Sequence, residues 1–320
     1  MLIFSLDGQD TQELVAVLRE LSEQSLNSAE IQQGELVHRH FPDGESYLNI
    51  LSNVEHQDVV VVCQLHQPND KLIDLMLFSE TVRQQSARTV SLVAPYLAYM
   101  RQDIKFQPGE CISSRHVAQW LSERFDSIIT IDPHLHRYKQ LDEIYSIKNS
   151  VIHATDIVAD FIRETIDNPI VIGPDSESEQ WASSVAEQAS CDAIVLNKIR
   201  HGDRDVEVSA PDLKNYLNHQ PILIDDIIST GKTMIKAAEN IVKLGGKAPI
   251  CIGVHGVFSD GAFTAMQQAD IAEIITCNTI AHPSNKISII PKLAKEILTM
   301  QSKLKEESNF QFNIQLKGEL

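Results

Sequence analysis

The chain has 320 residues, and its 27 lysine and arginine residues against 44 aspartate and glutamate residues give a formal net charge of −17. This length predicts about two domains with ample core, and the charge argues against nucleic acid or an anionic membrane as a partner, because both are polyanions. The five cysteines are scattered without CxxC spacing, which indicates neither a disulfide framework nor a zinc site and makes a reducing cytoplasm the expected location. The first residues lack a signal-peptide pattern and no apolar run approaches about eighteen residues, so we expect a protein that is neither exported nor membrane-spanning.

Seven short apolar runs, rich in β-branched residues, alternate with stretches of helical periodicity along the chain. This alternation predicts βαβ units, so the expected fold class is α/β with largely parallel sheets flanked by helices. Several runs end in polar residues, and open α/β sheets bind ligands at the carboxyl ends of their strands. In chain order, the predicted strands cover residues 59–65, 89–96, 127–132, 169–175, 193–196, 221–226 and 250–256.

Two of these runs, SIITIDPH (127–134) and PILIDDII (221–228), resemble one another, which suggests two halves built on one plan. The polar stretch SIKNS, residues 146–150, is the expected boundary between the halves. We therefore predict an N-terminal domain, a C-terminal domain and a polar C-terminal tail over residues 1–148, 149–302 and 303–320.

The most informative stretch is ILIDDIISTGKTM, residues 222–234. Its Thr-Gly-Lys-Thr ending resembles an ATPase phosphate loop, but that loop needs a glycine five positions before Gly231, where this chain has Asp226. The stretch instead predicts a strand, two acids, a small polar loop and a helix that ends at Gly245–Gly246. Residues 229–233 should therefore lie at a helix N-terminus, where free backbone amides and the helix dipole attract an anion.

The two acids of this stretch, Asp225 and Asp226, would repel a bare phosphate and so need another task. Carboxylates in this place suit the vicinal hydroxyls of a sugar or a Mg²⁺ ion, and a ribose phosphate meets both demands. For the acids alone, a buried strand that ends in an ordinary aspartate N-cap is an equally good interpretation. The Ser-Thr-Gly sequence that follows at this spacing favours a binding site.

Nine segments carry motifs in a fixed order: FPDGESYLNI (41–50), Asn-Asp (69–70), APYLAYMRQDIKF (94–106), ITIDPHLH (129–136), GPD (173–175), KIR (198–200), LIDDIISTGKT (223–233), HGVFSDGA (255–262) and NTI (278–280). Through them the chain resembles the ribose-phosphate pyrophosphokinase family, the synthases of phosphoribosyl pyrophosphate (PRPP), over nearly its whole length. The resemblance implies two similar phosphoribosyltransferase-type domains. It also implies Mg²⁺-dependent transfer of the β,γ-diphosphate of ATP to the 1-hydroxyl of ribose 5-phosphate, with release of AMP.

For the sugar phosphate, the resemblance implies that the loop from Ile227 to Thr233 binds the 5-phosphate of the ribose, while the two acids contact the ribose hydroxyls. Two loop positions differ from the commonest family pattern, because Ser229 replaces an acid and Lys232 replaces a glycine. A hydroxyl and a cation both still favour phosphate. The expected ribose 5-phosphate residues are Asp225, Asp226, Ser229, Thr230, Gly231, Lys232 and Thr233.

For ATP, Arg101 and Gln102 offer a cation and an amide to a triphosphate, although a surface pair between Arg101 and Asp103 is the plainer interpretation of these residues by themselves. His134 follows an apolar run and is implied as a further ATP contact. His134 and Asp175 are also the implied Mg²⁺ pair. Magnesium prefers oxygen ligands, so we expect Asp175 to be the firmer ligand and His134 to donate a hydrogen bond to a phosphate.

In FPDGE, Phe41 combines an aromatic face with the carboxylates of Asp43 and Glu45, a set suited to stacking on adenine and accepting from its amino group. By itself, Pro-Asp-Gly predicts only a turn. The family takes this loop from a neighbouring subunit. The resemblance therefore implies a homodimer as the smallest complete enzyme, or a higher homo-oligomer such as a hexamer.

Lys198 and Arg200, in NKIRHGDRDVEV, follow the run AIVL and lie in a stretch without apolar periodicity, which predicts an exposed loop. A solvated basic loop is the plainer interpretation of these residues alone. The resemblance implies that the two cations close over the polyphosphate and are the catalytic residues, because phosphoryl transfer depends on positioning and on electrostatic stabilisation.

Two other classes of function stay open. A phosphoribosyltransferase, which consumes PRPP, shares the Asp-Asp loop but has no need of the RQD and FPDGE motifs together. A catalytically silent regulatory homologue should have lost the loop cations, which are intact here. The segment SESEQWA (176–182) stands where the family pattern is usually rich in glycine, and it marks a divergent branch.

Overall fold

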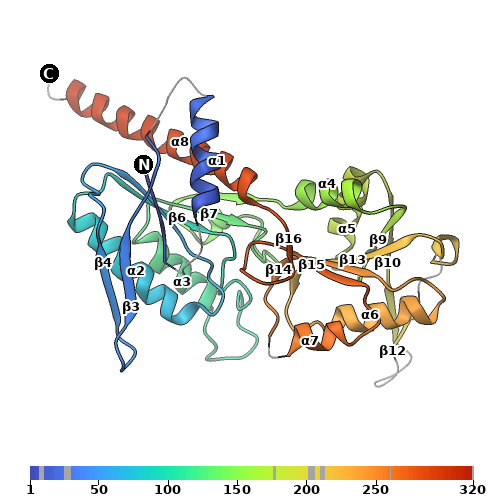
Figure 1. Cartoon of the computed structure of the whole chain (residues 1–320). Coiled ribbons are helices and arrows are strands. Elements are labelled where there is room, and N and C mark those ends of the chain that lie inside the picture. Colours follow the sequence, from blue (N-terminus) through green and yellow to red (C-terminus); the bar gives the residue numbers. More distant parts are fainter. Residues whose placement is uncertain are drawn as a thin grey trace. The chain divides into compact units, whose positions relative to one another are not determined.

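The chain forms two compact α/β units, each built on one six-stranded parallel sheet with helices packed against it (Figure 1). The first unit comprises Met1–Ile152 together with Ile290–Leu320, and the second comprises His153–Ile289. This architecture confirms the predicted fold class. The structure is a computed structural model that describes residues 1–6, 11–24, 30–175, 178–200, 206–209, 213–259 and 261–318.

The sheet of the first unit has the strand order β2-β1-β5-β6-β7-β8, and each neighbouring pair is parallel. An antiparallel hairpin of β3 and β4 is inserted in the chain between β2 and β5. The strands are β1 (Leu2–Ser5), β2 (Gln32–Gln33), β3 (Leu36–His40), β4 (Ser46–Ile50), β5 (Asp58–Val62), β6 (Thr89–Ala94), β7 (Ser127–Ile131) and β8 (Lys148–Ile152). The helices are α1 (Gln12–Glu23), α2 (Pro68–Gln84), α3 (Ser113–Ser122) and α8 (Ile290–Gly318), with a short 3-10 turn at Leu141–Glu143.

The second unit repeats this plan, because its sheet has the order β10-β9-β13-β14-β15-β16 and again carries a hairpin, β11 and β12, between its second and third strands in the chain. The strands are β9 (Pro169–Gly173), β10 (Asp192–Val195), β11 (Asn197–Arg200), β12 (Val206–Ser209), β13 (Gln220–Ile228), β14 (Ile250–Gly256), β15 (Glu273–Cys277) and β16 (Asn285–Ile287). The helices are α4 (Thr155–Thr165), α5 (Glu179–Ala189), α6 (Lys232–Lys243) and α7 (Ala262–Gln267), with a 3-10 turn at Leu213–Tyr216.

The repeat confirms two halves on one plan, but the strands correspond differently from the predicted match. In the two sheet orders β13 takes the place of β5, whereas β7 takes the place of β15. The likeness between SIITIDPH and PILIDDII therefore joins strands that are not equivalent. Any buried parallel strand that ends at the ligand edge tends to read as an isoleucine-rich run followed by an acid, so a short likeness of this kind does not identify the partner strand.

All seven predicted strands are present, since β5, β6, β7, β9, β10, β13 and β14 fall on them. Every residue of β5, β6 and β7 is buried, as expected for a parallel sheet covered on both faces. Burying each large aliphatic side chain contributes about 1.5–3 kcal/mol relative to exposure. The sequence patterns did not predict the remaining strands of the two sheets, which are β1, β2, β8, β15 and β16.

The predicted domain boundaries differ from the units of the structure. The stretch SIKNS runs into β8 instead of forming a linker, and the first unit continues to Ile152. Residues 290–302 belong to the first unit, and residues 303–318 continue helix α8 instead of forming a separate tail. The two repeats exchange these helices: α8 follows β16 yet packs on α1 and β8, and α4 follows β8 yet packs on α5 and β16.

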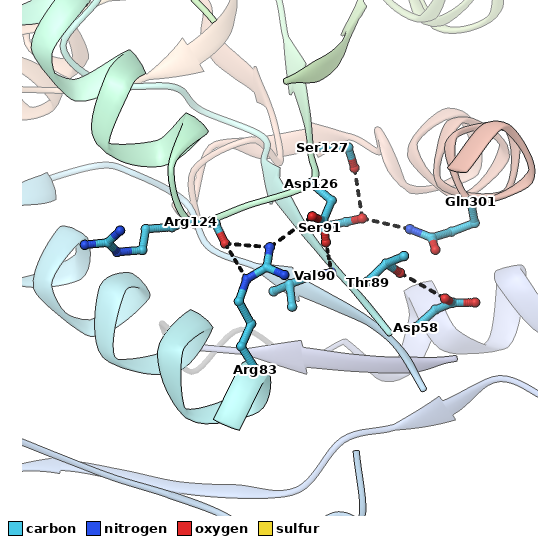
Figure 2. A network of polar contacts seen from close by, with 9 residues as sticks. All are labelled: Asp58, Arg83, Thr89, Val90, Ser91, Arg124, Asp126, Ser127 and Gln301. Atoms are coloured by element: carbon cyan, nitrogen blue, oxygen red, sulfur yellow. Dashed lines mark hydrogen bonds and ion pairs between the residues drawn. The ribbon is translucent and has the colours of Figure 1, made fainter. Parts of the chain in front are cut away.

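Buried polar contacts explain why α8 joins the first unit. Figure 2 shows Gln301 of α8 beside Ser91 and Ser127, which lie on the neighbouring strands β6 and β7. The Gln301 Nε2 donates to Ser91 Oγ at 2.9 Å, and Ser127 Oγ donates to the same oxygen at 2.8 Å. All three side chains are buried, so each depends on the others for hydrogen bonding.

A second anchor of α8 is the buried carboxylate of Asp58 at the start of β5, which lies 3.6 Å from Lys305 Nζ. Arg88 Nε donates to Asp58 Oδ1 at 2.7 Å. Thr89 Oγ1 donates to the same oxygen at 2.9 Å (Figure 2). Burial by itself would raise the pKa of Asp58, but the hydrogen bonds from Arg88 and Thr89 and the charge of Arg88 together lower that pKa below its ordinary value. Within the described part of the chain, no helix has the length and apolar character needed to cross a membrane.

We expect Ser91→Ala to lower the free energy of unfolding by about 1–3 kcal/mol, because it leaves the buried Ser127 and Gln301 side chains without their shared partner. Urea unfolding followed by circular dichroism measures this change. The control is Ser302→Ala on the exposed side of α8, where the hydroxyl bonds only to the Leu298 carbonyl. Equal stability of Ser91→Ala and Ser302→Ala would show that the polar junction does not hold α8.

Candidate functional site

In the second unit, the predicted Mg²⁺ ligand Asp175 and the predicted sugar-phosphate residues lie at the carboxyl ends of two adjacent strands. Asp175 follows β9, and the neighbouring strand β13 carries Asp225 and Asp226 near its end. The backbone amide of Asp226 donates to Asp225 Oδ1 at 3.0 Å. Both β13 acids are half-buried, so the sheet holds carboxylates together at the edge where parallel sheets bind ligands.

The predicted polar loop leads into helix α6, whose first residue is Lys232 and whose last is Lys243. This confirms the expected helix N-terminus. The N-cap is Gly231 with φ of 68°, and a Cβ there would lie 2.7 Å from Met266 Sδ, so both the backbone and the packing require glycine. Because the cap falls on glycine, the acids of β13 are not the N-cap of this helix, and that plainer interpretation of them is excluded.

The loop is shorter than predicted at its start. Ile227 and Ile228 continue β13 and pair in register with His255 and Gly256 of β14. The loop proper is anchored at Ser229, whose carbonyl accepts from the Ser259 amide at 3.0 Å. The side chains of Thr230, Lys232 and Thr233 are exposed, so their polar groups face solvent at the start of the helix. This arrangement provides hydroxyls, an ammonium group and free helix amides that can bind an anion.

The carboxylates at this edge carry an electrostatic cost. Burial, the charge and hydrogen bond of Asp226, and the charge of Asp175 together raise the pKa of Asp225 to about 8. At neutral pH, Asp225 therefore tends to hold a proton until a hydrogen-bond donor or a cation arrives. A sugar hydroxyl that donates to this carboxylate, or a nearby Mg²⁺ ion, would favour its ionised form.

The raised pKa of Asp225 has a defined effect on stability. The unfolded residue loses its proton near pH 4, while the folded residue keeps it up to about pH 8. Its contribution to stability is therefore present in full below about pH 4 and is lost as the pH rises through about 8. Asp225→Asn removes this titration. We expect the variant to gain stability relative to the wild type between these pH values, with a slope of at most about 1.4 kcal/mol per pH unit.

Chemical unfolding at a series of pH values tests this expectation. The control is Asp270→Asn, an exposed aspartate in the same unit, which should follow the wild-type pH profile. If the stability difference between Asp225→Asn and the wild type were constant from pH 5 to about pH 8, the raised pKa assigned to Asp225 would be wrong.

Asp175 lies in a tight turn between β9 and α5. The carbonyl of Asp175 accepts from Ser178 Oγ at 2.7 Å, and the Asp175 amide lies 3.4 Å from the same hydroxyl. A Cβ at Gly173, the last residue of β9, would lie 2.8 Å from Ser178 Oγ, so a side chain there would displace this hydroxyl. Ser178 thus closes the turn within the divergent segment 176–182, of which residues 176–177 lie outside the described residues.

The predicted catalytic pair, Lys198 and Arg200, lies on β11, where Lys198 pairs with Val208 and Arg200 with Val206 of β12. The expected loop is therefore a hairpin, and that prediction was wrong. A hairpin outside the main sheet needs no buried face, so backbone pairing forms without apolar periodicity. The side chains of both residues and the segment 201–205 lie outside the described residues.

In the first unit, the FPDGE motif forms the tip of the β3–β4 hairpin. The Phe41 amide donates to the Glu45 carbonyl at 2.7 Å, and the Gly44 amide donates to the Phe41 carbonyl at 2.9 Å. The turn expected from Pro-Asp-Gly is thus present, and Gly44 has φ of 93°. The Phe41 ring is 39% exposed, and the side chains of Asp43 and Glu45 are exposed as well. The tip therefore presents an aromatic face and two carboxylates to solvent.

The other predicted ATP residues follow β6 and β7, which are neighbours in the first sheet. Arg101 and Gln102 are exposed, whereas Asp103 is buried and accepts from Arg137 Nη1 at 2.7 Å. The alternative pair of Arg101 with Asp103 is thus replaced by a pair with Arg137. His134 is half-buried, and its ring meets that of His136 with 3.8 Å between centroids.

Two supporting contacts were missed by sequence reasoning. Tyr138, close after His134, donates its hydroxyl to the Asp103 carbonyl at 3.2 Å and so joins the two segments that were predicted to bind ATP. In the second unit, His255 Nδ1 lies 2.9 Å from Thr279 Oγ1, which connects the HGV and NTI motifs. His255 and Thr279 lie within recognised motifs, which was their only signal in the sequence, whereas Tyr138 lies two residues beyond ITIDPHLH and had none.

Comparison with known proteins assigns the two halves separately. Residues 14–124 match the N-terminal domain of ribose phosphate pyrophosphokinase, and residues 140–291 match the phosphoribosyl transferase domain. The ribose-phosphate pyrophosphokinase of Sulfolobus acidocaldarius is 34% identical over 257 residues, which cover 79% of this chain and 87% of that protein. The chain belongs to the ribose-phosphate pyrophosphokinase family.

Other members agree with this placement. The ribose-phosphate pyrophosphokinase of Thermococcus kodakarensis is 31% identical over 257 residues, covering 80% of this chain and 90% of that protein. The crystal structure of phosphoribosylpyrophosphate synthetase from Mycobacterium smegmatis matches with a TM-score of 0.78 at 24% identity, and the match covers 94% of this chain and 99% of that one. This structural match supports the fold of the chain, which the pyrophosphokinase family shares.

Proposed function

We propose that this family member synthesises PRPP by transferring the β,γ-diphosphate of ATP to the 1-hydroxyl of ribose 5-phosphate, with AMP as the other product. The observation that carries the proposal is the second-unit edge, where a helix N-terminus with exposed hydroxyls lies beside Asp225 and Asp226. An anion site next to hydrogen-bond acceptors suits a phosphate ester of a sugar better than a free phosphate.

In this proposal the residues of the second unit bind the acceptor. The free amides of α6, with Ser229, Thr230, Lys232 and Thr233, bind the 5-phosphate. Asp225 and Asp226 accept hydrogen bonds from the ribose hydroxyls, and donation from a hydroxyl favours release of the proton that the raised pKa of Asp225 retains.

The residues of the first unit are proposed to bind ATP. The exposed Phe41 ring stacks on adenine and the carboxylates of the hairpin tip accept from its amino group. Arg101 and Gln102 contact the polyphosphate, for which their exposed side chains are available. Asp103 and Arg137 hold the turn that carries them.

The site chemistry fits Mg²⁺, which prefers oxygen ligands and is usually held by one or two carboxylates together with phosphate oxygens and water. Burial and the neighbouring carboxylates of Asp226 and Asp175 raise the pKa of Asp225, and a divalent cation would relieve the part that is due to negative charge. We propose that Asp175 holds the ion and that His134 donates to the polyphosphate. When bound, Mg²⁺ would neutralise charge on the phosphate oxygens.

The direct test is to incubate the protein with ATP, Mg²⁺ and ribose 5-phosphate and to separate the nucleotides by anion-exchange chromatography. We expect AMP and PRPP to appear in equal amounts, and only when all three components are present. ADP as the product, or no turnover, would contradict the proposal. Conversion of PRPP and a base into a nucleotide would favour the phosphoribosyltransferase alternative, which lacks a role for the first-unit motifs.

Lys198 and Arg200 are proposed to stabilise the charge that develops on the transferred phosphates. We expect Lys198→Ala and Arg200→Ala to fold normally and to bind ATP nearly as the wild type does, yet to lose on the order of 10²-fold in kcat. Steady-state kinetics and isothermal titration measure the two effects, with Lys236→Ala, an exposed cation of α6, as the control. An unchanged kcat with a raised KM would show that the cations bind substrate only in its ground state.

We further propose that the hairpin tip completes the adenine site of a neighbouring subunit, so that the active protein is a homodimer or a higher homo-oligomer. Mixing inactive Glu45→Ala with inactive Lys198→Ala protein, under conditions of subunit exchange, should restore part of the activity through hybrid sites. Native mass spectrometry verifies the exchange. Hybrid oligomers that stay inactive would place the complete site within one chain.

A further inference from the structure

Three side chains of types that commonly ligate metal ions in proteins lie together where the β3–β4 hairpin packs on α2. His38 and His40 are alternate residues of β3 and therefore project from the same face of the hairpin. On that side lies Asp74 of α2, whose carboxylate is only 4% exposed. The Asp74 Oδ2 atom is 3.0 Å from His38 Nε2 and 3.9 Å from His40 Nε2, and all three ligand atoms lie within 4.8 Å of one another.

The carboxylate of Asp74 is oriented by a second residue of the hairpin. Ser46 of β4, which pairs with His40 in the register, donates its hydroxyl to Asp74 Oδ1 at 2.5 Å. This bond occupies one carboxylate oxygen and leaves Oδ2 facing both imidazoles. A hydrogen bond from a neighbouring hydroxyl is the usual way in which proteins orient a metal-binding carboxylate.

The His38 Nε2 atom gives an independent indication of a ligand. The atom is buried, and within the described part of the chain no hydrogen bond is aligned with it, although Asp74 Oδ2 is only 3.0 Å away. A direct hydrogen bond at that distance would satisfy both groups, so the misalignment leaves a buried polar atom without a hydrogen-bond partner, which is unfavourable. A cation that both atoms coordinate satisfies them without requiring the N–H to point at the carboxylate.

We propose that His38, His40 and Asp74 bind a divalent transition metal ion of the zinc type where the hairpin lies on α2, next to its tip. Two imidazoles and one carboxylate suit Zn²⁺ and Co²⁺, whereas Mg²⁺ prefers oxygen ligands. With bonds of about 2.0–2.2 Å, tetrahedral ligands are about 3.3–3.6 Å apart, and the two observed separations of 3.0 and 3.9 Å lie on either side of that range. Three protein ligands leave a coordination position for water. The ion is thus distinct from the Mg²⁺ that accompanies ATP.

The position of the cluster gives the ion a mechanical consequence. It joins β3 to α2, and the next residues along the hairpin form the tip at Phe41–Glu45. Between the two histidines, Arg39 projects to the other face and lies over the rings of Phe41 and Tyr47, at 4.6 and 4.3 Å from their centroids. An ion bound there would therefore restrain the end of β3 from which the tip continues.

The first test uses the full chain, freed of metal with a chelator and titrated with Zn²⁺ or Co²⁺ alone. We expect His40→Gln to bind one metal ion fewer than the wild type, or to bind it about tenfold or more weakly, since even outer-sphere changes have effects of this size. His40 is 42% exposed, so the variant should fold normally, which circular dichroism checks. His56→Gln, at a histidine that is 81% exposed, is the matched control and should bind metal as the wild type does.

The second test locates the ion. Hydrogen exchange measured by mass spectrometry should slow on addition of Zn²⁺ in peptides that cover residues 36–50 and 68–84, and this protection should be absent in His40→Gln. Equal Zn²⁺ binding by the wild type and His40→Gln would overturn the proposal. Protection confined to the region of His134 and His136 would overturn it as well, because those rings also lie close together. Neither outcome depends on whether the protein makes PRPP.

Discussion

A parallel sheet buries both of its faces, and each sheet of this protein therefore needs helices on both sides. In the first unit that cover is incomplete without α8, which arrives from the far end of the chain and supplies the buried side chains of Leu293, Ile297 and Met300. The second unit depends in the same way on α4, which follows the last strand of the first sheet. The exchange of these helices makes the integrity of each unit depend on both repeats.

Because both faces are covered, polar residues collect at the carboxyl ends of the strands. This arrangement explains how a chain with a net charge of −17 can still offer a site to phosphates. Backbone amides at the start of α6 provide positive potential without a net charge, and Gly231 allows the chain to turn into that helix. The cost of placing carboxylates beside an anion site shows as the raised pKa of Asp225. A bound sugar or cation would relieve that cost, so binding and deprotonation are coupled.

The two hairpins occupy equivalent places in the two repeats, between the second and third strands, and each carries a motif that we propose to act in catalysis or in ATP binding. Insertions at the edge of a rigid sheet can change sequence without disturbing the core, which is why functional residues concentrate there. The β3–β4 hairpin shows how such an insertion is held, since polar contacts of His38 and Ser46 with Asp74 join it to α2, and Leu36, Leu48 and Ile50 pack into the core of the first unit. His38 and Asp74, which we propose to bind the metal ion, are therefore also residues that attach the hairpin to α2.

The sequence by itself determined the features that depend on neighbouring residues along the chain. The buried strands read as apolar runs, α6 begins within the predicted residues 229–233 and ends just before Gly245–Gly246, and the order of the motifs indicated the family. Only the tertiary structure decided that α8 belongs to the first unit, that β5 and β13 are equivalent, and that Asp103 pairs with Arg137. It also decided that Asp175 raises the pKa of Asp225 and that two histidines meet Asp74. These features depend on distances between residues far apart in the chain, and local periodicity and turn chemistry carry no information about such distances.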